Sequence, residues 1–123
     1  MIYKIAIASS DGNYVDRHFG AAEKFLIVSL DTEKETYDTV EFREVIPPCS
    51  GGDHSISAFD AVLEKLSDVS AVIAQRAGPG AERFLTENGI AVYQLPGENE
   101  QALCTLLEEN RWEADRWLSH TKN

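Results

Sequence analysis

The sequence predicts one α/β domain built on a mixed five-stranded sheet. Its 123 residues, of which 43% are hydrophobic, suffice for one compact core and are too few for two ordinary domains. Three segments with strand character come first, and helical and strand patterns alternate after them. This β-β-β-α-β-α-β-α order implies an antiparallel meander joined to a parallel pair of strands through right-handed crossovers. We assign residues 1–110 to the domain and residues 111–123 to a helical or flexible C-terminal tail.

The meander is predicted from three apolar segments separated by turn-forming residues. Residues 2–8 alternate isoleucine with smaller residues and run into a turn cluster at 9–13. Residues 25–30 form the second predicted strand, and 31–35 form a polar hairpin tip. Residues 37–45 alternate apolar and charged side chains, which is typical of a strand with one exposed face. Two prolines at 47 and 48 end that strand, because proline cannot donate to a strand ladder.

The second half alternates helices with strands. Apolar residues recur at helical spacing over 56–66, with Ser50 or Asp53 placed to cap. The almost wholly apolar run at 70–74 indicates a central strand covered on both faces. A helix follows with Pro79 near its first turn and Gly89 at its C-cap, and 90–95 is another strand. Asn99 is expected to cap the last helix, in which Cys104 is interpreted as packing.

Composition excludes several classes of partner. Eleven Lys and Arg oppose twenty-one Asp and Glu, which gives a formal net charge of −10, so nucleic acid and anionic membrane surfaces are disfavoured. No segment approaches the roughly 20 apolar residues that span a bilayer, and the N-terminus lacks the pattern of a signal peptide. The two cysteines form no disulfide framework. We therefore expect a cytoplasmic protein, and its oligomeric state stays open.

The predicted strand directions place four connections at one edge of the sheet, which we call the loop edge. These connections are residues 10–24, 46–54, 75–80 and 96–98. Ligands of open α/β sheets favour the edge at which parallel strands end. The loop edge gathers most of the reactive side chains: Asp11, Asp16, Arg17, His18, Cys49, His54, Gln75 and Arg76. The sequence therefore predicts the functional site there.

A cysteine and two histidines at the loop edge suggest an incomplete metal site. Thiolate and imidazole suit zinc, copper(I) or iron in a sulfur-rich environment. The spacing of Cys49 and His54 is a weak motif alone, and the chain lacks the four thiolates or paired cysteines of a closed site. Such a site could hold a preassembled cluster loosely, and Arg17 and Arg76 would complement an anionic cluster.

Structural interpretations stand beside this one. The His18 imidazole could instead fix its turn through a backbone carbonyl, Cys49 could be a structural thiol, and His54 could be a polar residue of a first helical turn. His120 is interpreted as a solvated tail residue.

Enzymatic interpretations are weaker, so we expect no catalytic activity. A Cys-His nucleophile would need a third orienting group and an oxyanion hole. The element order resembles a ribonuclease-H-like scaffold, yet residues 2–8 and 70–74 carry no acid to bind two catalytic metal ions. The Gly78-Pro79-Gly80 turn lacks the lysine and serine of a phosphate-binding loop. A thiol redox enzyme is disfavoured because no second cysteine stands near Cys49.

An ordered set of motifs carries a family resemblance. In chain order they are KIAIASSDG, VDRHFGAAEKFLIVSLD, CSGGDH, AVIAQRAGPGAERFLTENGIAVYQL and PGENEQAL. Together they resemble the dinitrogenase iron-molybdenum cofactor biosynthesis family, of the NifX and NifB C-terminal domain type. The resemblance covers about residues 2–109, and HFG with its flanking strands is among its most specific parts.

The resemblance implies a ribonuclease-H-like three-layer α/β/α domain with a carrier role in nitrogen fixation. Such a domain binds the iron-molybdenum cofactor or its iron-sulfur precursor and passes it between cluster donor and acceptor proteins, without catalysis of its own. By position, His18, Cys49 and His54 are the candidate metal ligands, and Arg17 and Arg76 are the supporting contacts. The alternative is a regulatory or interaction module that binds a small anion or a protein partner at the same edge without metal. Trp112 and Trp117 motivate it, since they form either a core lid or a docking patch.

Overall fold

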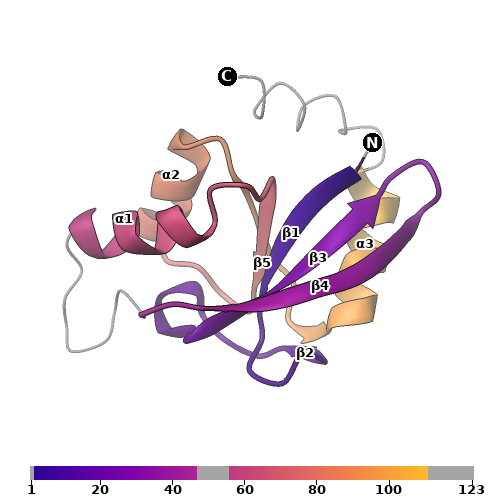
Figure 1. The fold of residues 1–123 in the computed structure, drawn as a ribbon, viewed down its shortest axis with the longest axis horizontal. Coiled ribbons are helices and arrows are strands. Elements are labelled where there is room, and N and C mark those ends of the chain that lie inside the picture. The colour runs from indigo at the N-terminus through magenta and orange to yellow at the C-terminus, as the bar shows by residue number, and fades with distance from the viewer. Residues whose placement is uncertain (1, 47–55, 111–123) are drawn as a thin grey trace.

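The computed structural model of the chain describes residues 2–46 and 56–110, and it shows a mixed five-stranded sheet (Figure 1). The sheet has the order β4-β3-β1-β5-β6. Its strands are β1 (Ile2–Ala8), β3 (Lys24–Asp31), β4 (Thr36–Glu44), β5 (Ala71–Ala74) and β6 (Ala91–Gln94). The β1, β3 and β4 strands form the antiparallel meander, while β5 pairs parallel to both β1 and β6. The prediction of a mixed five-stranded sheet is therefore confirmed.

The described residues also form three α-helices, a short 3-10 helix and a small second sheet. The helices are α1 (Ile56–Lys65), α2 (Pro79–Glu87) and α3 (Asn99–Asn110). The second sheet pairs β2 (Tyr14–Val15) with β7 (Gly97–Glu98), and a short 3-10 helix, η1, spans Phe19–Ala21. The sequence patterns did not predict β2, η1 or β7, so the structure contains three short elements beyond the predicted order. The ribonuclease-H-like assignment stays a prediction.

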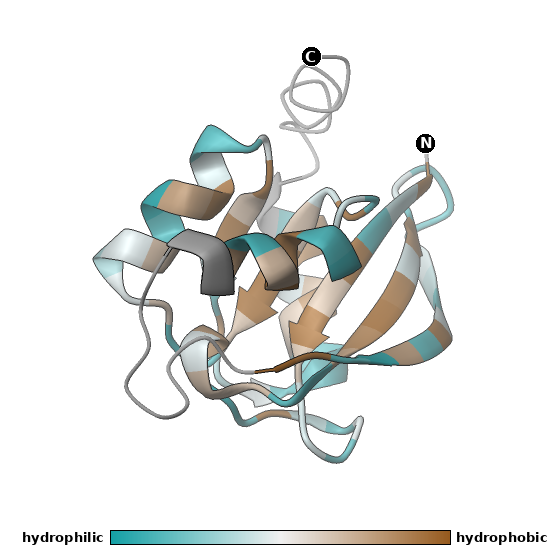
Figure 2. Cartoon of the chain, turned by 60° about the vertical axis from the view of Figure 1, so that its left-hand side comes forward, coloured by the Kyte–Doolittle hydropathy of each residue, from teal (hydrophilic) through white to brown (hydrophobic). Residues whose placement is uncertain are grey.

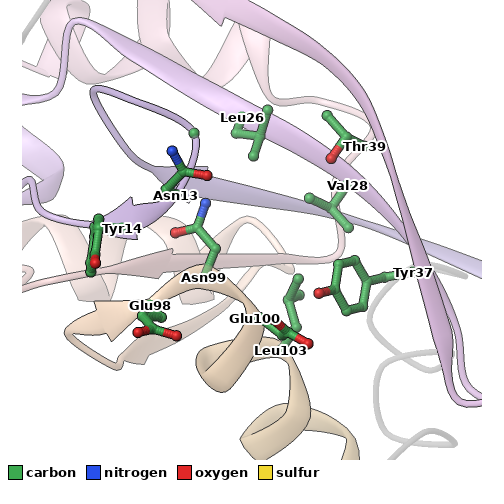
Figure 3. A pocket seen from close by; sticks show the side chains of 11 residues that line it. Asn13, Tyr14, Leu26, Val28, Tyr37, Thr39, Glu98, Asn99, Glu100 and Leu103 are labelled. Carbon is green, nitrogen blue, oxygen red and sulfur yellow. The ribbon is translucent and has the colours of Figure 1, made fainter.

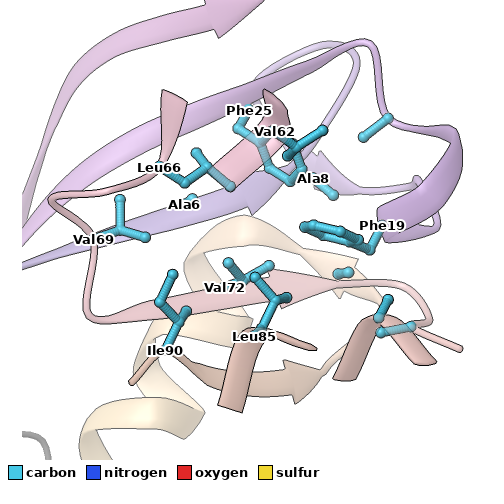
Figure 4. Close-up of a cluster of buried hydrophobic side chains, with 14 of the residues drawn as sticks. Ala6, Ala8, Phe19, Phe25, Val62, Leu66, Val69, Val72, Leu85 and Ile90 are labelled. Atoms are coloured by element: carbon cyan, nitrogen blue, oxygen red, sulfur yellow. The ribbon is translucent and has the colours of Figure 1, made fainter. Parts of the chain in front are cut away.

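Helices cover the sheet on both faces, with a separate hydrophobic cluster on each. Because successive side chains of a strand point to opposite faces, Ala6 and Ala8 of β1 join one cluster while Ile5 and Ile7 join the other. The first cluster packs against α1 and α2 (Figure 4), and the second packs against α3. Figure 2 shows apolar residues along the central strands and polar residues on the outer sides of the helices.

The strand register places the predicted connections at one edge. Ala8 at the end of β1 pairs with Phe25 at the start of β3, and Lys24 pairs with Glu44 at the end of β4. Ala74 and Gln94 pair at the ends of β5 and β6. Residues 9–23, 45–46, 75–78 and 95–96 therefore leave the sheet at the loop edge, and the 32–35 turn lies at the opposite end. Within the described ranges, none of the helices is long and apolar enough to cross a membrane.

An ion pair fastens the outermost strand of the meander to the end of α1. The Arg43 guanidinium donates two hydrogen bonds to the Asp68 carboxylate, one of them with an Nη2 to Oδ2 distance of 2.9 Å, and also reaches the Lys65 carbonyl. Lys4 of β1 contacts the same carboxylate at 3.0 Å. These contacts, led by Arg43, hold the pKa of Asp68 well below its usual range.

The Asp68→Asn substitution is expected to lower the free energy of unfolding by about 1 kcal/mol near neutral pH, because a two-pronged but exposed pair is worth little more. The folded-state pKa of Asp68 is below the unfolded value of 3.8, so its contribution is complete above that value and is lost as the pH falls below it. The free energies of unfolding of wild type and variant, measured in urea, should therefore become equal in acid. Asp38→Asn, at an exposed β4 aspartate, is the control. A gap that stays constant into acid would contradict the prediction.

Candidate functional site

The first loop of the edge is shaped by its own polar side chains. The Asp11 carboxylate accepts hydrogen bonds from the amides of Asn13 at 2.8 Å and Tyr14 at 3.0 Å, which lower its pKa. The Ser9 hydroxyl accepts from the Gly12 amide at 2.9 Å, and Gly12 has a positive φ of 82° that favours glycine. Asp11 therefore builds the loop, although the sequence grouped it with the reactive residues.

Asp16 closes the same loop from its other end. Its carboxylate accepts hydrogen bonds from both the amide and the hydroxyl of Ser10, with an amide distance of 2.9 Å. The carboxylates of Asp11 and Asp16 are thus engaged in local hydrogen bonds. The residues that follow Asp16 are held in a defined position.

Backbone hydrogen bonds bring Arg17 and His18 beside Arg76. The Gln75 amide donates to the Arg17 carbonyl at 2.9 Å, and the Phe19 amide donates to the Arg76 carbonyl at 2.8 Å. His18 and Arg76 form a parallel bridge between two connections that are far apart in the sequence. The structure therefore places three of the five predicted site residues together.

All three side chains point to solvent without partners in the described part of the chain. Arg17, His18 and Arg76 are exposed, and none makes a side-chain hydrogen bond or ion pair with another described residue. At His18, the backbone carbonyl receives the Ala21 amide at 3.1 Å, while the imidazole makes no capping hydrogen bond to η1. The turn is fixed by the backbone, and within the described ranges the imidazole is free to take a ligand.

Phe19 anchors this turn in the core. Its side chain is only 1% exposed, and its ring centroid lies 5.6 Å from that of Phe25 (Figure 4). The centroid of the Phe59 ring lies 6.5 Å away. Aromatic pairs at such separations add to the energy of burial. An exposed imidazole thus stands directly beside a buried ring, which limits how far the turn can move.

The surroundings of Arg76 and Arg17 carry mixed charge, since Arg17 lines a separate hollow with Glu23, Lys24 and Glu44. Arg76 lines a shallow hollow with the first turn of α2, where Gly78 holds the N-cap position without a side-chain cap. Pro79 lies at the start of α2, as predicted. Unsatisfied amides at a helix N-terminus carry partial positive charge, and Arg83 lines the same hollow. The hollow also contains Glu82, so its charge is mixed.

Other predicted residues fall outside this picture. Cys49 and His54 lie outside the described residues, as do Trp112, Trp117 and His120, so their roles stay predictions. Cys104 was expected to pack inside the last helix, but it is exposed. Helical residues one step apart differ by about 100° around the axis, so Cys104 leaves the buried stripe that Leu103 occupies. In the described ranges, no three His, Cys, Asp or Glu side chains gather as a metal site.

One feature at the start of α3 was also missed. Asn99 was expected to cap this helix, yet neither polar atom of its side chain has a hydrogen-bond partner in the described part of the chain. Its backbone amide instead donates to the Asn13 carbonyl at 2.8 Å, and its side chain lies in a hollow between α3 and the meander. A cap and a hollow-facing asparagine look the same in a sequence, so no local signal separates them.

These features define a small α/β domain that displays an imidazole and two guanidinium groups at the loop edge of a mixed sheet. Comparison with known proteins assigns its family. The sequence pattern of the dinitrogenase iron-molybdenum cofactor family matches residues 1–109, so the chain belongs to that family and the predicted resemblance is confirmed.

Three relatives illustrate the match. The FeMo cofactor biosynthesis protein NifB of Chlorobaculum tepidum is 35% identical over 99 residues, which are 80% of this chain and 22% of that protein. An uncharacterized protein of Methanocaldococcus jannaschii is 32% identical over 94 residues, 76% of this chain and 75% of that protein. A crystal structure from the same organism, provisionally named a dinitrogenase, shares the fold with a TM-score of 0.58 at 16% identity, covering 88% of this chain and 90% of that one. The chain spans about a fifth of the length of NifB.

Proposed function

We propose that this chain is a non-catalytic, cytoplasmic carrier that binds the iron-molybdenum cofactor or an iron-sulfur precursor of it at the loop edge. The observation that carries the proposal is the exposed His18 imidazole, unpartnered among the described residues and held beside Arg17 and Arg76 by backbone hydrogen bonds. Membership of an iron-molybdenum cofactor family supports this cargo.

The chemistry of the three side chains suits temporary binding of a metal-sulfur cluster. A neutral imidazole is a ligand for iron. The guanidinium groups offer planar hydrogen-bond donors and permanent positive charge to an anionic cluster. Cys49 and His54 stay the predicted further ligands. With so few protein ligands the cluster would keep most of its own coordination, which favours release to an acceptor protein.

The proposal is tested by loading and transfer under anaerobic conditions. Purified protein is mixed with isolated cofactor, or reconstituted with iron and sulfide, and is then desalted. We expect metal and a visible chromophore to elute with the protein, and transfer to an apo-acceptor to follow. A colourless protein with no metal after both treatments would refute the carrier proposal.

The second candidate, a module that binds a small anion or a protein partner without metal, is favoured by one observation. Arg17 and Arg76 have no carboxylate partner among the described residues, in a protein with a formal net charge of −10. If this candidate is correct, citrate added to metal-free protein should shift the amide NMR signals of residues 17–19 and 75–78. Those shifts, together with no metal uptake, would select the second candidate over the first.

A further inference from the structure

A second hollow lies on the α3 face of the sheet, and it shares no residue with the Arg17, His18 and Arg76 cluster. Its volume is about 500 Å³. Figure 3 shows it between the 12–14 loop, the start of α3 and the β3–β4 strands. The described residues that line it include Glu98 and Glu100 but no lysine, arginine or histidine. Its chemistry therefore differs from that of the Arg17, His18 and Arg76 cluster.

The side chain of Asn99 is buried at this hollow without a partner. Asn99 is only 6% exposed, and both its Nδ2 and its Oδ1 are buried without a hydrogen bond in the described part of the chain. The bond from the Asn99 amide to the Asn13 carbonyl fixes the backbone beneath it. Buried polar atoms are nearly always hydrogen-bonded. A donor and an acceptor held together in a hollow therefore call for a complementary group.

The residues that line the hollow indicate what kind of ligand carries this complementary group. Leu26, Val28 and Leu103 supply an almost fully buried apolar wall. Tyr37 lies on the same side (Figure 3), where burial, and next the charge of Glu100, raises the pKa of its hydroxyl. A tyrosine hydroxyl is protonated at neutral pH in any case, so it can donate a hydrogen bond to a ligand. The described lining of the hollow contains the carboxylates of Glu98 and Glu100 and no basic side chain. An anionic ligand is therefore disfavoured.

We propose that this hollow binds a small uncharged organic molecule that carries an amide group. The ligand amide pairs with the Asn99 carboxamide through one N–H···O bond in each direction, and its apolar part lies on Leu26, Val28 and Leu103. This binding goes beyond the carrier function and is independent of metal.

The test uses two amides and their acids as matched probes. Benzamide and nicotinamide are compared with benzoate and nicotinate in saturation-transfer NMR against the full metal-free chain. We expect signals from the amides and weak or no signals from the acids. Asn99→Leu should weaken amide binding about tenfold or more, because the pair with the carboxamide is lost. Asn88→Leu, the same change at an exposed asparagine at the end of α2, should leave binding unchanged.

Stability measurements separate ligand binding from a structural role of Asn99. If the Asn99 carboxamide has no partner in the ligand-free protein, Asn99→Leu removes an unpaired buried polar group. The melting temperature of the ligand-free protein should then stay unchanged or rise. A clear drop in melting temperature would show that an ordered water or another internal group partners Asn99, and would overturn the proposal. Equal binding of amides and acids, or no binding of either at millimolar concentration, would overturn it as well.

Discussion

The His18→Ala variant is expected to take up about tenfold to a hundredfold less cluster than wild-type protein under equal anaerobic loading. Losing a group that only supports a metal ligand usually costs that much affinity, and His18 is the proposed ligand itself, which backbone bonds hold beside Arg76. Its exposed side chain makes no capping hydrogen bond to η1, so the melting temperature should change little. Bound iron and sulfide per protein, measured after desalting, checks the loss.

Companion variants separate ligation from charge. Arg17→Gln combined with Arg76→Gln should weaken loading less than His18→Ala, and the effect should shrink at high salt because screening reduces the wild-type advantage. Cys104→Ser is the control, since it removes an exposed thiol on α3 that could bind iron nonspecifically. If His18→Ala loads as well as wild type while Cys104→Ser does not, the loop edge is not the cluster site.

Phe19→Ala is expected to produce the largest loss of stability, about 3–5 kcal/mol. The ring is 1% exposed and packs near Phe25 in the cluster beneath α1 and α2 (Figure 4). Phe59 stacks on it from α1. Total stabilities of small domains are only about 5–15 kcal/mol, so the melting temperature should fall by more than about 10 °C. Urea or thermal unfolding followed by circular dichroism measures it.

Two further variants show whether the effect comes from burial. Phe19→Leu fills much of the same space and should cost only about 1–2 kcal/mol. Tyr14→Ala removes an aromatic ring from the same loop, but one that is 49% exposed, and should cost less than about 1 kcal/mol. Equal stability of Phe19→Ala and Tyr14→Ala would mean that the His18 turn is not anchored in the core.

The sheet could be predicted because its signals are local and strong. The β5 strand is buried along its whole length, so it appears in the sequence as an unbroken apolar run. Gly89 ends α2 with a positive φ of 80°, as its position after the helix indicated. Strands β2 and β7 have two residues each, which is too short for any alternation to be recognised.

The site could be predicted only in part, because its geometry depends on contacts between distant residues. The shared edge followed from strand directions, but the hydrogen bonds that join Arg17 to Gln75 and Phe19 to Arg76 have no signature in either segment alone. The prediction that Asn99 caps α3 was wrong for the same reason, since Asn13 and the meander decide where its side chain lies. Residue type and spacing predicted which groups reach the loop edge, but not which connections bond to each other there.

The bonds that join residues 17–19 to residues 75 and 76 run between main-chain atoms. Because the Arg17 carbonyl, the Phe19 amide and their partners at 75 and 76 do not depend on side-chain identity, positions 17, 18 and 76 are open to substitution. A relative can exchange imidazole for thiol or guanidinium for amide there while keeping the scaffold intact. The groups displayed at this edge can therefore change while the fold is kept, because Phe19 and these main-chain bonds hold the turn.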